Sequence, residues 1–161
     1  THPLSVHYAT CLQEITNIIT DNIKPENLPT INNNLVFSDE TAFNLDEVVK
    51  ENPNETDFKG YNTVDMFLGM KDVDDSRKLL FVEFKLDCKG TKKLKDGDSK
   101  DKIRDSKRIV FGGGIRVHNT YIFIFNNEYL LKEQARSEIS RKLNNQSIKV
   151  LSIGDLKTDF F

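Results

Sequence analysis

The chain has 161 residues, a formal net charge of −2, 37% hydrophobic residues and 30% charged residues. This length fits a single domain over residues 1–161, and the composition is that of a folded protein rather than a disordered one. No apolar run approaches the roughly 18 residues that a membrane span needs, and no basic-then-apolar signal pattern opens the chain. We therefore expect no membrane partner.

The small number of cysteines and histidines limits which metals the chain can bind and in which cellular compartment it is expected. Cys11 and Cys88 form neither a CxxC pair nor a zinc-type spacing, and the chain has three histidines. We therefore expect no zinc site built on Cys and His and no disulfide framework, and a reducing cytoplasm is the expected location. The chain begins at Thr1 rather than Met, which is consistent with a piece of a longer protein, and a homodimer and a larger parent protein both stay open as its assembly.

Charge is distributed unevenly along the chain. Residues 1–58 hold two basic and ten acidic residues, whereas residues 89–108 hold nine Lys or Arg and four Asp. A polyanion is attracted to the basic segment and repelled by the first third. We expect Lys92, Lys93 and Lys95 to face a phosphate backbone; the alternative is a solvated lysine-rich loop.

The first third of the chain predicts a helix, a short strand and a loop. Apolar residues recur at helical spacing over roughly 8–22, which indicates an amphipathic helix. A short strand is expected at 35–37 after an Asn-rich turn. The polar stretch 38–60 is typical of a loop, with about one turn of helix around 45–49.

The middle of the chain predicts a hairpin followed by a helix. Two strand-like runs, 61–69 and 79–88, flank a charged turn at 71–77. A lysine-rich loop follows at 89–97. Asp98 or Ser99 can cap a helix that runs to about Val110, and Gly112–Gly114 would end that helix.

The last third predicts a strand, a helix and a strand. The β-branched and aromatic run 120–125 is typical of a buried strand. Apolar residues at helical spacing predict a helix over 128–144, and a last strand is expected at 148–153. The complete order of elements predicts an α/β protein with a mixed central sheet flanked by helices.

The run LLFVEFKLDC at residues 79–88 carries a candidate site. Strand alternation places its apolar and charged residues on opposite faces. A half-exposed strand whose charged side meets water would give the same pattern. Carboxylate and lysine two residues apart also recur elsewhere, as in Asp57 and Lys59, but only Glu83 and Lys85 lie in a strongly apolar strand. The two faces are Val82, Phe84, Leu86 and Cys88 on one side and Glu83, Lys85 and Asp87 on the other.

Asp65 interrupts the other apolar run of the predicted hairpin, TVDMFLG. An aspartate is unfavourable in a buried strand unless something binds it. If the two runs are neighbours, Asp65 and Glu83 converge, and two carboxylates with room for water are what Mg²⁺ takes when it bridges protein and phosphate. Such an ion polarises a phosphoryl oxygen and activates a bound water, while Lys85 steers that water or stabilises the transition state.

Asp65 followed by Glu83-Phe84-Lys85 resembles the motif of the PD-(D/E)xK nuclease superfamily. A preceding helix, a hairpin that carries the acids, and then helix, strand, helix and strand resemble the restriction-endonuclease-like core of that family over most of residues 8–153. One departure is Val64, which stands where the family has Pro. The resemblance implies hydrolysis of phosphodiester bonds with Mg or Mn as cofactor.

The resemblance also implies roles for individual residues. Asp65 and Glu83 match the metal ligands, the Phe84 backbone carbonyl is a third candidate ligand, and Lys85 matches the catalytic lysine. Glu14 on the first helix is a further candidate ligand, with the polar side of an amphipathic helix as the alternative. On the helix after the motif, the candidates for phosphate contact are Lys102, Ser106 and Lys107.

Three functions are consistent with these residues. The first is a metal-dependent endonuclease acting on DNA. The second is a binding or regulatory protein that keeps the nuclease fold without activity, since fold does not determine function. The third is an RNA-cleaving endonuclease; no aromatic-rich platform for single strands is evident, which favours duplex DNA.

Overall fold

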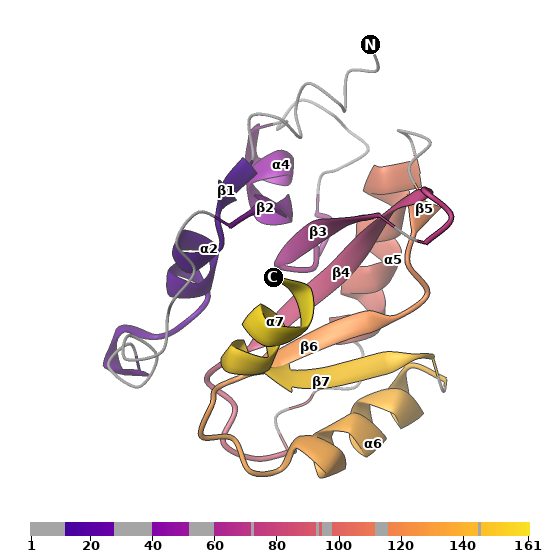
Figure 1. The fold of residues 1–161 in the computed structure, drawn as a ribbon. Helices are drawn as coiled ribbons and strands as arrows, with labels where there is room; N and C mark the ends of the chain where they lie inside the picture. The colour runs from indigo at the N-terminus through magenta and orange to yellow at the C-terminus, as the bar shows by residue number, and fades with distance from the viewer. Residues whose placement is uncertain are drawn as a thin grey trace.

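A computed structural model describes residues 12–27, 40–51, 60–71, 73–92, 94, 98–111, 116–144 and 146–161. This part of the chain is a mixed α/β structure with one mixed sheet (Figure 1). The strands are β1 (Leu12–Glu14), β2 (Thr41–Asn44), β3 (Met66–Lys71), β4 (Arg77–Lys85), β5 (Arg116–Val117), β6 (Tyr121–Phe125) and β7 (Ile148–Ser152). The helices are α2 (Ile15–Asp21), α4 (Leu45–Glu51), α5 (Asp98–Phe111), α6 (Lys132–Lys142) and α7 (Ile153–Phe160), with a short 3-10 helix η1 (Pro25–Asn27).

The sheet has an antiparallel half and a parallel half that meet at β4. Its strand order is β1-β2-β3-β4-β6-β7, and the short β5 pairs with the beginning of β4. Neighbours from β1 to β4 are antiparallel, whereas β4, β6 and β7 are parallel. Parallel neighbours need long crossovers, and α5 and α6 supply them. The hairpin β3–β4 therefore lies at the centre of the sheet.

Helices cover both faces of the sheet and form two hydrophobic clusters. On one face, residues of α5 and α6 pack with Phe81 of β4 and Phe123 of β6. On the other face, residues of α2 and α7 pack with Val82 and Ile122. Figure 1 shows α5 and α7 on opposite sides of the central strands. In the middle of β4, residues 79–84 are apolar except for Glu83, as expected for a strand covered on both faces.

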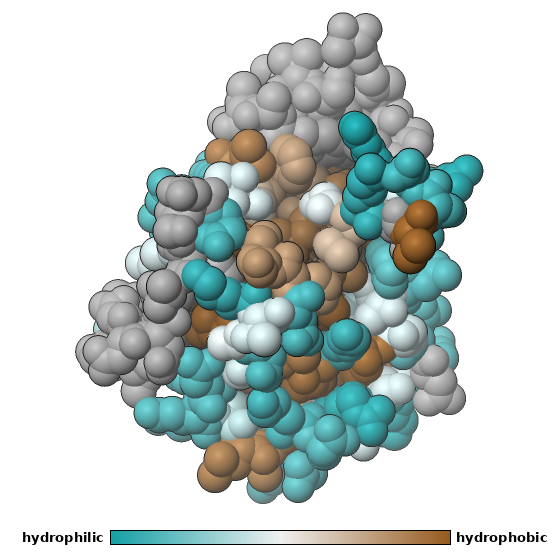
Figure 2. Space-filling view, viewed as in Figure 1, coloured by the Kyte–Doolittle hydropathy of each residue, from teal (hydrophilic) through white to brown (hydrophobic). Residues whose placement is uncertain are grey.

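Some hydrophobic residues on the face covered by α2 and α7 stay partly exposed. Met70, Leu151 and Phe160 pack against its cluster but are only partly buried. In Figure 2, which views this side, apolar residues are seen near the middle of the surface between polar residues. No helix in the described ranges has both the length and the apolar character that crossing a bilayer requires.

Most predicted elements are confirmed in the described ranges. The hairpin, the helix that begins at Asp98, the strand near 120–125 and the helix between 128 and 144 are all present. The central sheet is mixed and flanked by helices, as expected. The strand expected at 35–37 and the glycines expected to end α5 lie outside the described residues.

The predicted first helix is partly wrong. Leu12–Glu14 forms a strand, and the helix begins only at Ile15. Pairing of β1 with β2 places Leu12 opposite Phe43, and this long-range pairing overrides the local helical spacing. The stretch expected to be a loop with one turn also contains β2 and a longer helix, α4, because buried Ala42 and Leu45 anchor it to the sheet.

The ends of three strands also differ from the prediction. The first strand of the hairpin was expected at 61–69, but β3 begins at Met66, so Asp65 lies before the strand rather than within it. β4 ends at Lys85, so the alternation expected to continue to Cys88 stops. Asp87 instead accepts hydrogen bonds from the Lys24 N–H and the Asn27 side chain, near α2 rather than beside Glu83. At the other end of the chain, Ser152 caps α7, and its hydroxyl accepts the Asp155 N–H. The last strand therefore stops one residue early.

Candidate active site

Asp65 lies immediately before β3, at the point where the chain joins the sheet. Pairing between β3 and β4 begins with Met66 opposite Val82. The Phe84 N–H donates to Asp65 Oδ2 at 2.6 Å, so a side-chain carboxylate continues the hydrogen bonding where the strand pairing ends. Asp65 is 4% exposed. The Phe84 N–H therefore fixes a buried carboxylate in place.

Helix α5 holds the segment that leads into Asp65. The buried hydroxyl of Ser106 accepts the Val64 N–H at 2.9 Å. Asp105, also on α5, accepts the Asn62 N–H at 3.1 Å. These two bonds satisfy backbone donors in a segment without strand pairing, as buried N–H groups require. They also set the distance between Asp65 and the helix.

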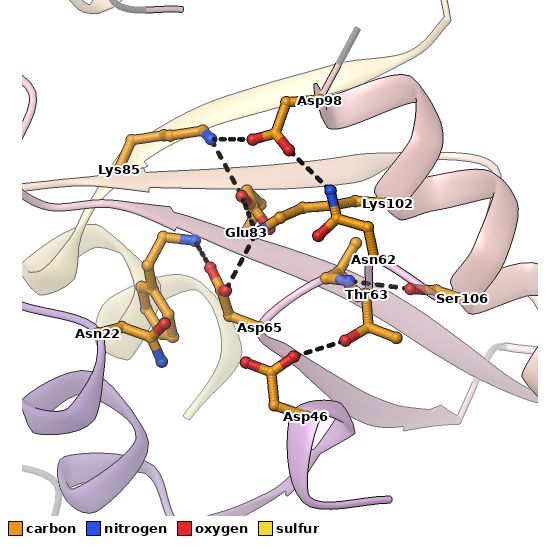
Figure 3. Close-up of polar contacts among 12 residues, drawn as sticks. Asn22, Asp46, Asn62, Thr63, Asp65, Glu83, Lys85, Asp98, Lys102 and Ser106 are labelled. Carbon is orange, nitrogen blue, oxygen red and sulfur yellow. Dashed lines mark hydrogen bonds and ion pairs between the residues drawn. The ribbon is translucent and has the colours of Figure 1, made fainter. Parts of the chain in front are cut away.

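Glu83 lies on β4 beside Asp65, and its carboxylate forms ion pairs with two lysines. Lys102 of α5 places Nζ 2.7 Å from Glu83 Oε1 and 3.4 Å from Asp65 Oδ1. Lys85 places its own Nζ 3.0 Å from the same Glu83 oxygen. Figure 3 shows these side chains converging from β4, α5 and the start of β3. The two carboxylates therefore lie around one point, with a lysine ammonium at that point.

A second, more exposed group surrounds Lys85. Asp98, at the first residue of α5, lies 3.8 Å from the Lys85 ammonium and accepts a hydrogen bond from the Asn62 side chain at 2.8 Å. The side chain of Asp98 is 41% exposed, whereas that of Lys85 is 17% exposed. Lys85 thus lies between the buried carboxylates and the protein surface.

The buried charges shift the pKa values of the pair and its lysine. Burial, followed by the nearby charge of Glu83, raises the pKa of Asp65 from 3.8 to about 7, against the lowering effects of Lys102 and the Phe84 N–H. Burial lowers the pKa of Lys102, but the charges of Glu83 and Asp65 outweigh it and raise that pKa above its ordinary value. Lys102 is therefore a fixed cation, while Asp65 changes its protonation near neutral pH.

The second oxygen of Glu83 has no hydrogen-bond partner among the described residues. Glu83 is 3% exposed and borders a cavity of about 10 Å³ that Phe81, Ile103 and Tyr121 also line. A cavity of this size has room for about one water. A buried carboxylate oxygen without a partner is costly, so this atom has unused capacity to bind a cation or a water.

The donor set fits a hard divalent ion that keeps several waters. Asp65 Oδ1 and Glu83 Oε1 share one ammonium neighbour, so they are close enough to approach a common ion. No group of three or more His, Cys, Asp or Glu side chains that could hold a metal occurs in the described part of the chain. Mg²⁺ typically takes one or two carboxylates and fills its other positions with water and phosphate.

Other predicted site residues lie in different surroundings. Glu14 is exposed at the end of β1 and does not group with Asp65 and Glu83. The Phe84 N–H, rather than its carbonyl, meets Asp65, and the role of the carbonyl stays a prediction. A residue outside the prediction, Asp46 of α4, accepts a hydrogen bond from the Thr63 hydroxyl close to the pair.

The residues predicted to contact phosphate are also separated by the fold. Lys102 pairs with carboxylates, Ser106 is buried against Val64, and the Lys107 ammonium lies 5.2 Å from the centre of the Tyr121 ring. Lys92 is exposed in the loop after β4. Lys93 and Lys95 lie outside the described residues.

Asp98 and Asn62 complete the site and were missed by the sequence patterns. Asp98 was expected only as a helix cap, and an isolated Asn in a predicted strand gives no signal of its own.

Searches against protein-family models, curated proteins and solved structures found no match to this chain.

Ser106→Ala should lower the free energy of unfolding by about 1–3 kcal/mol, because the buried Val64 N–H loses its acceptor. Urea unfolding measures this loss. Ser137→Ala, at an exposed position of α6, is the matched control and should change stability by less than about 0.5 kcal/mol. Equal effects of the two substitutions would contradict a positioning role for Ser106.

Asp65→Asn should stabilise the metal-free protein more at about pH 8 than at about pH 5. The pKa of Asp65 is about 7 in the fold against an ordinary 3.8, so the folded state binds more protons between these values. The wild type therefore loses stability as the pH rises through this window, and an uncharged amide does not. Urea unfolding with a chelator should show a difference that grows by roughly 1–4 kcal/mol; a difference independent of pH would contradict this account.

Proposed function

We propose that this chain is a metal-dependent endonuclease that hydrolyses phosphodiester bonds in DNA. The observation that carries the proposal is the convergence of Asp65 and Glu83, with Lys85 3.0 Å from Glu83. Two buried carboxylates at one point are unfavourable unless cations hold them. The presence of this buried charged pair in an apolar hairpin is more readily explained by a catalytic role than by a contribution to stability.

Asp65 and Glu83 would hold the ion, Mg²⁺ or Mn²⁺. When bound there, such an ion supplies a Lewis acid for the phosphoryl oxygen and lowers the pKa of a bound water. The Phe84 N–H keeps Asp65 oriented. Lys85, on the solvent side of Glu83, is placed to stabilise negative charge on a phosphate that approaches from the surface.

The order of elements supports a restriction-endonuclease-like core. Helix α2, the hairpin β3–β4, and then α5, β6, α6 and β7 follow one another in the order that the sequence resemblance implies. The two acids lie at the open end of that hairpin, with Asp65 just before β3 and Glu83 near the end of β4, and the next helix contributes a lysine to them. A fold of this kind is shared by active and inactive proteins, so the site carries the argument.

A specific observation favours a second candidate, a binding protein with the same fold and no catalysis. The Lys102 ammonium already lies between the two carboxylates and forms an ion pair with each of them without a metal. If Lys102 is a permanent substitute for the ion, the charged face would serve an interface instead of hydrolysis. Divalent-metal binding separates the two candidates.

DNA is proposed as the substrate because basic residues cluster after β4. Lys24, Lys89 and Lys92 line a groove of about 540 Å³, which also contains the acidic residues Glu26 and Asp87. This groove lies between η1 and the loop that follows β4, and its lysines are the proposed contacts of a phosphate backbone. The proposed setting is the cytoplasm, and assays on plasmid, single-stranded DNA and RNA distinguish DNA from RNA as the substrate.

Lys85→Met should abolish most cleavage while leaving metal binding nearly intact. Loss of one well-placed electrostatic contact to a transition state costs on the order of 10²–10³ in rate. Asp65→Asn should lose metal binding and cleavage together, since it removes a ligand but keeps an acceptor for the Phe84 N–H. Plasmid nicking with Mg²⁺ and calorimetric metal titration measure the two properties separately.

Lys78→Met, which removes the same charge near the beginning of β4, is the control and should retain cleavage. If Lys85→Met cuts as fast as the wild type, the catalytic role of Lys85 is wrong. If the wild type cuts no nucleic acid with any divalent metal, the binding-protein candidate replaces the nuclease.

Reversing Lys89 and Lys92 to Glu should weaken DNA binding and flatten its salt dependence. Each phosphate contact contributes about 0.9 to the slope of log affinity against log salt, so the slope should fall by up to about 2. Arg136→Glu with Arg141→Glu on α6 reverses two exposed charges elsewhere and serves as the control. Equal slopes for both double variants would show that the loop is only a solvated surface.

A further inference from the structure

The position of Lys102 is unusual for a surface-helix lysine. Its ammonium lies 2.7 Å from Glu83 and 3.4 Å from Asp65, and its side chain is only 17% exposed. These are the two oxygens proposed to bind a divalent ion. A cation that touches both would stand within about 5 Å of the ammonium if Lys102 kept its place. The ion and the ammonium would then compete for the same negative charge with little water between them.

We propose that Lys102 is a built-in counter-ion that holds the carboxylate pair in the metal-free protein and must leave when a divalent ion binds. This inference rests on the proposed metal-dependent function. It adds that Lys102 regulates the binding of the divalent ion. The metal-free pair is kept together rather than splayed by repulsion, so the ligands are already in place. The cost is a lower affinity for the ion, which has to displace a bound charge.

The fold provides a position for the displaced lysine. Asp98 lies four residues before Lys102 on α5, and side chains at this spacing are neighbours on a helix. The charge of Asp98 already acts on Lys102. The side chain of Asp98 is 41% exposed, and its ion pair with Lys85 is long, at 3.8 Å. The Asp98 carboxylate can therefore accept a second ammonium. Lys102 can therefore turn toward solvent along α5 without losing an anionic partner.

Lys102→Met tests the proposal, because methionine keeps an unbranched stem and removes the charge. Mn²⁺ titration of the full chain without nucleic acid, followed by electron paramagnetic resonance of the free ion, gives the dissociation constant. We expect the variant to bind Mn²⁺ at least about ten-fold more tightly than the wild type. It should also be less stable than the wild type in chelator and gain more in unfolding temperature from Mn²⁺.

Lys100→Met is the matched control, since it removes the same charge from an exposed position of α5. Its Mn²⁺ affinity should stay within about two-fold of the wild type. If Lys102→Met binds Mn²⁺ as the wild type does, or more weakly, while the wild type binds it, the counter-ion role is wrong and the metal site stands. If neither protein binds a divalent ion, the proposed metal-dependent function fails, and this inference fails with it.

A measurement on the wild type keeps the test valid if the variant does not fold. Reductive methylation with mass spectrometry reports how accessible each lysine ammonium is, with Lys100 as the internal reference. Saturating Mg²⁺ should raise the methylation rate of Lys102 at least about three-fold, because its ammonium leaves the carboxylates. An unchanged or slower rate at Lys102 with Mg²⁺ bound would overturn the proposal.

Discussion

The buried ion cluster of Asp65, Glu83 and Lys102 is the constraint on which the centre of this structure depends. Both carboxylates are almost completely buried, and leaving one buried charge without its partner typically costs about 3–5 kcal/mol. Helix α5 must therefore keep its position on the sheet, so that Lys102 stays beside the two carboxylates. Replacement of the cluster by apolar residues would often be neutral or stabilising, so its presence argues for a use other than stability.

Helix α5 connects this cluster to the rest of the site. Asp98, Lys102, Asp105 and Ser106 follow one another at spacings of four, three and one residues, which places them on one side of the helix. This polar stripe faces Lys85, the carboxylate pair and the segment before β3. The hydrophobic residues of α5, such as Ile109, pack beside it. A single helix therefore positions both the acids and the lysines. The exposed basic residues proposed to bind a phosphate backbone lie elsewhere, in the loop after β4.

The sequence predicted the parts of this site that depend on local pattern. Glu83 and Lys85 interrupt one apolar run of the sequence and Asp65 interrupts the other, so the predicted hairpin was sufficient to bring the acids together, although Asp65 lies just before β3 in the structure. Lys102 was expected at a phosphate instead, because helical spacing places it near the motif without showing which charge it meets. Leu12–Glu14 followed a helical pattern, but pairing with β2 makes it a strand and leaves Glu14 exposed. Contacts between distant segments decide both cases, and a single sequence does not record them.

A crystal structure with Mn²⁺, with anomalous scattering recorded to locate the ion, tests the central claim most directly. The account predicts a manganese peak about 2.1 Å from one oxygen each of Asp65 and Glu83, with the Lys102 ammonium moved away from them. A structure at saturating Mn²⁺ with no peak at this point, and with Lys102 still between the two carboxylates, would contradict it.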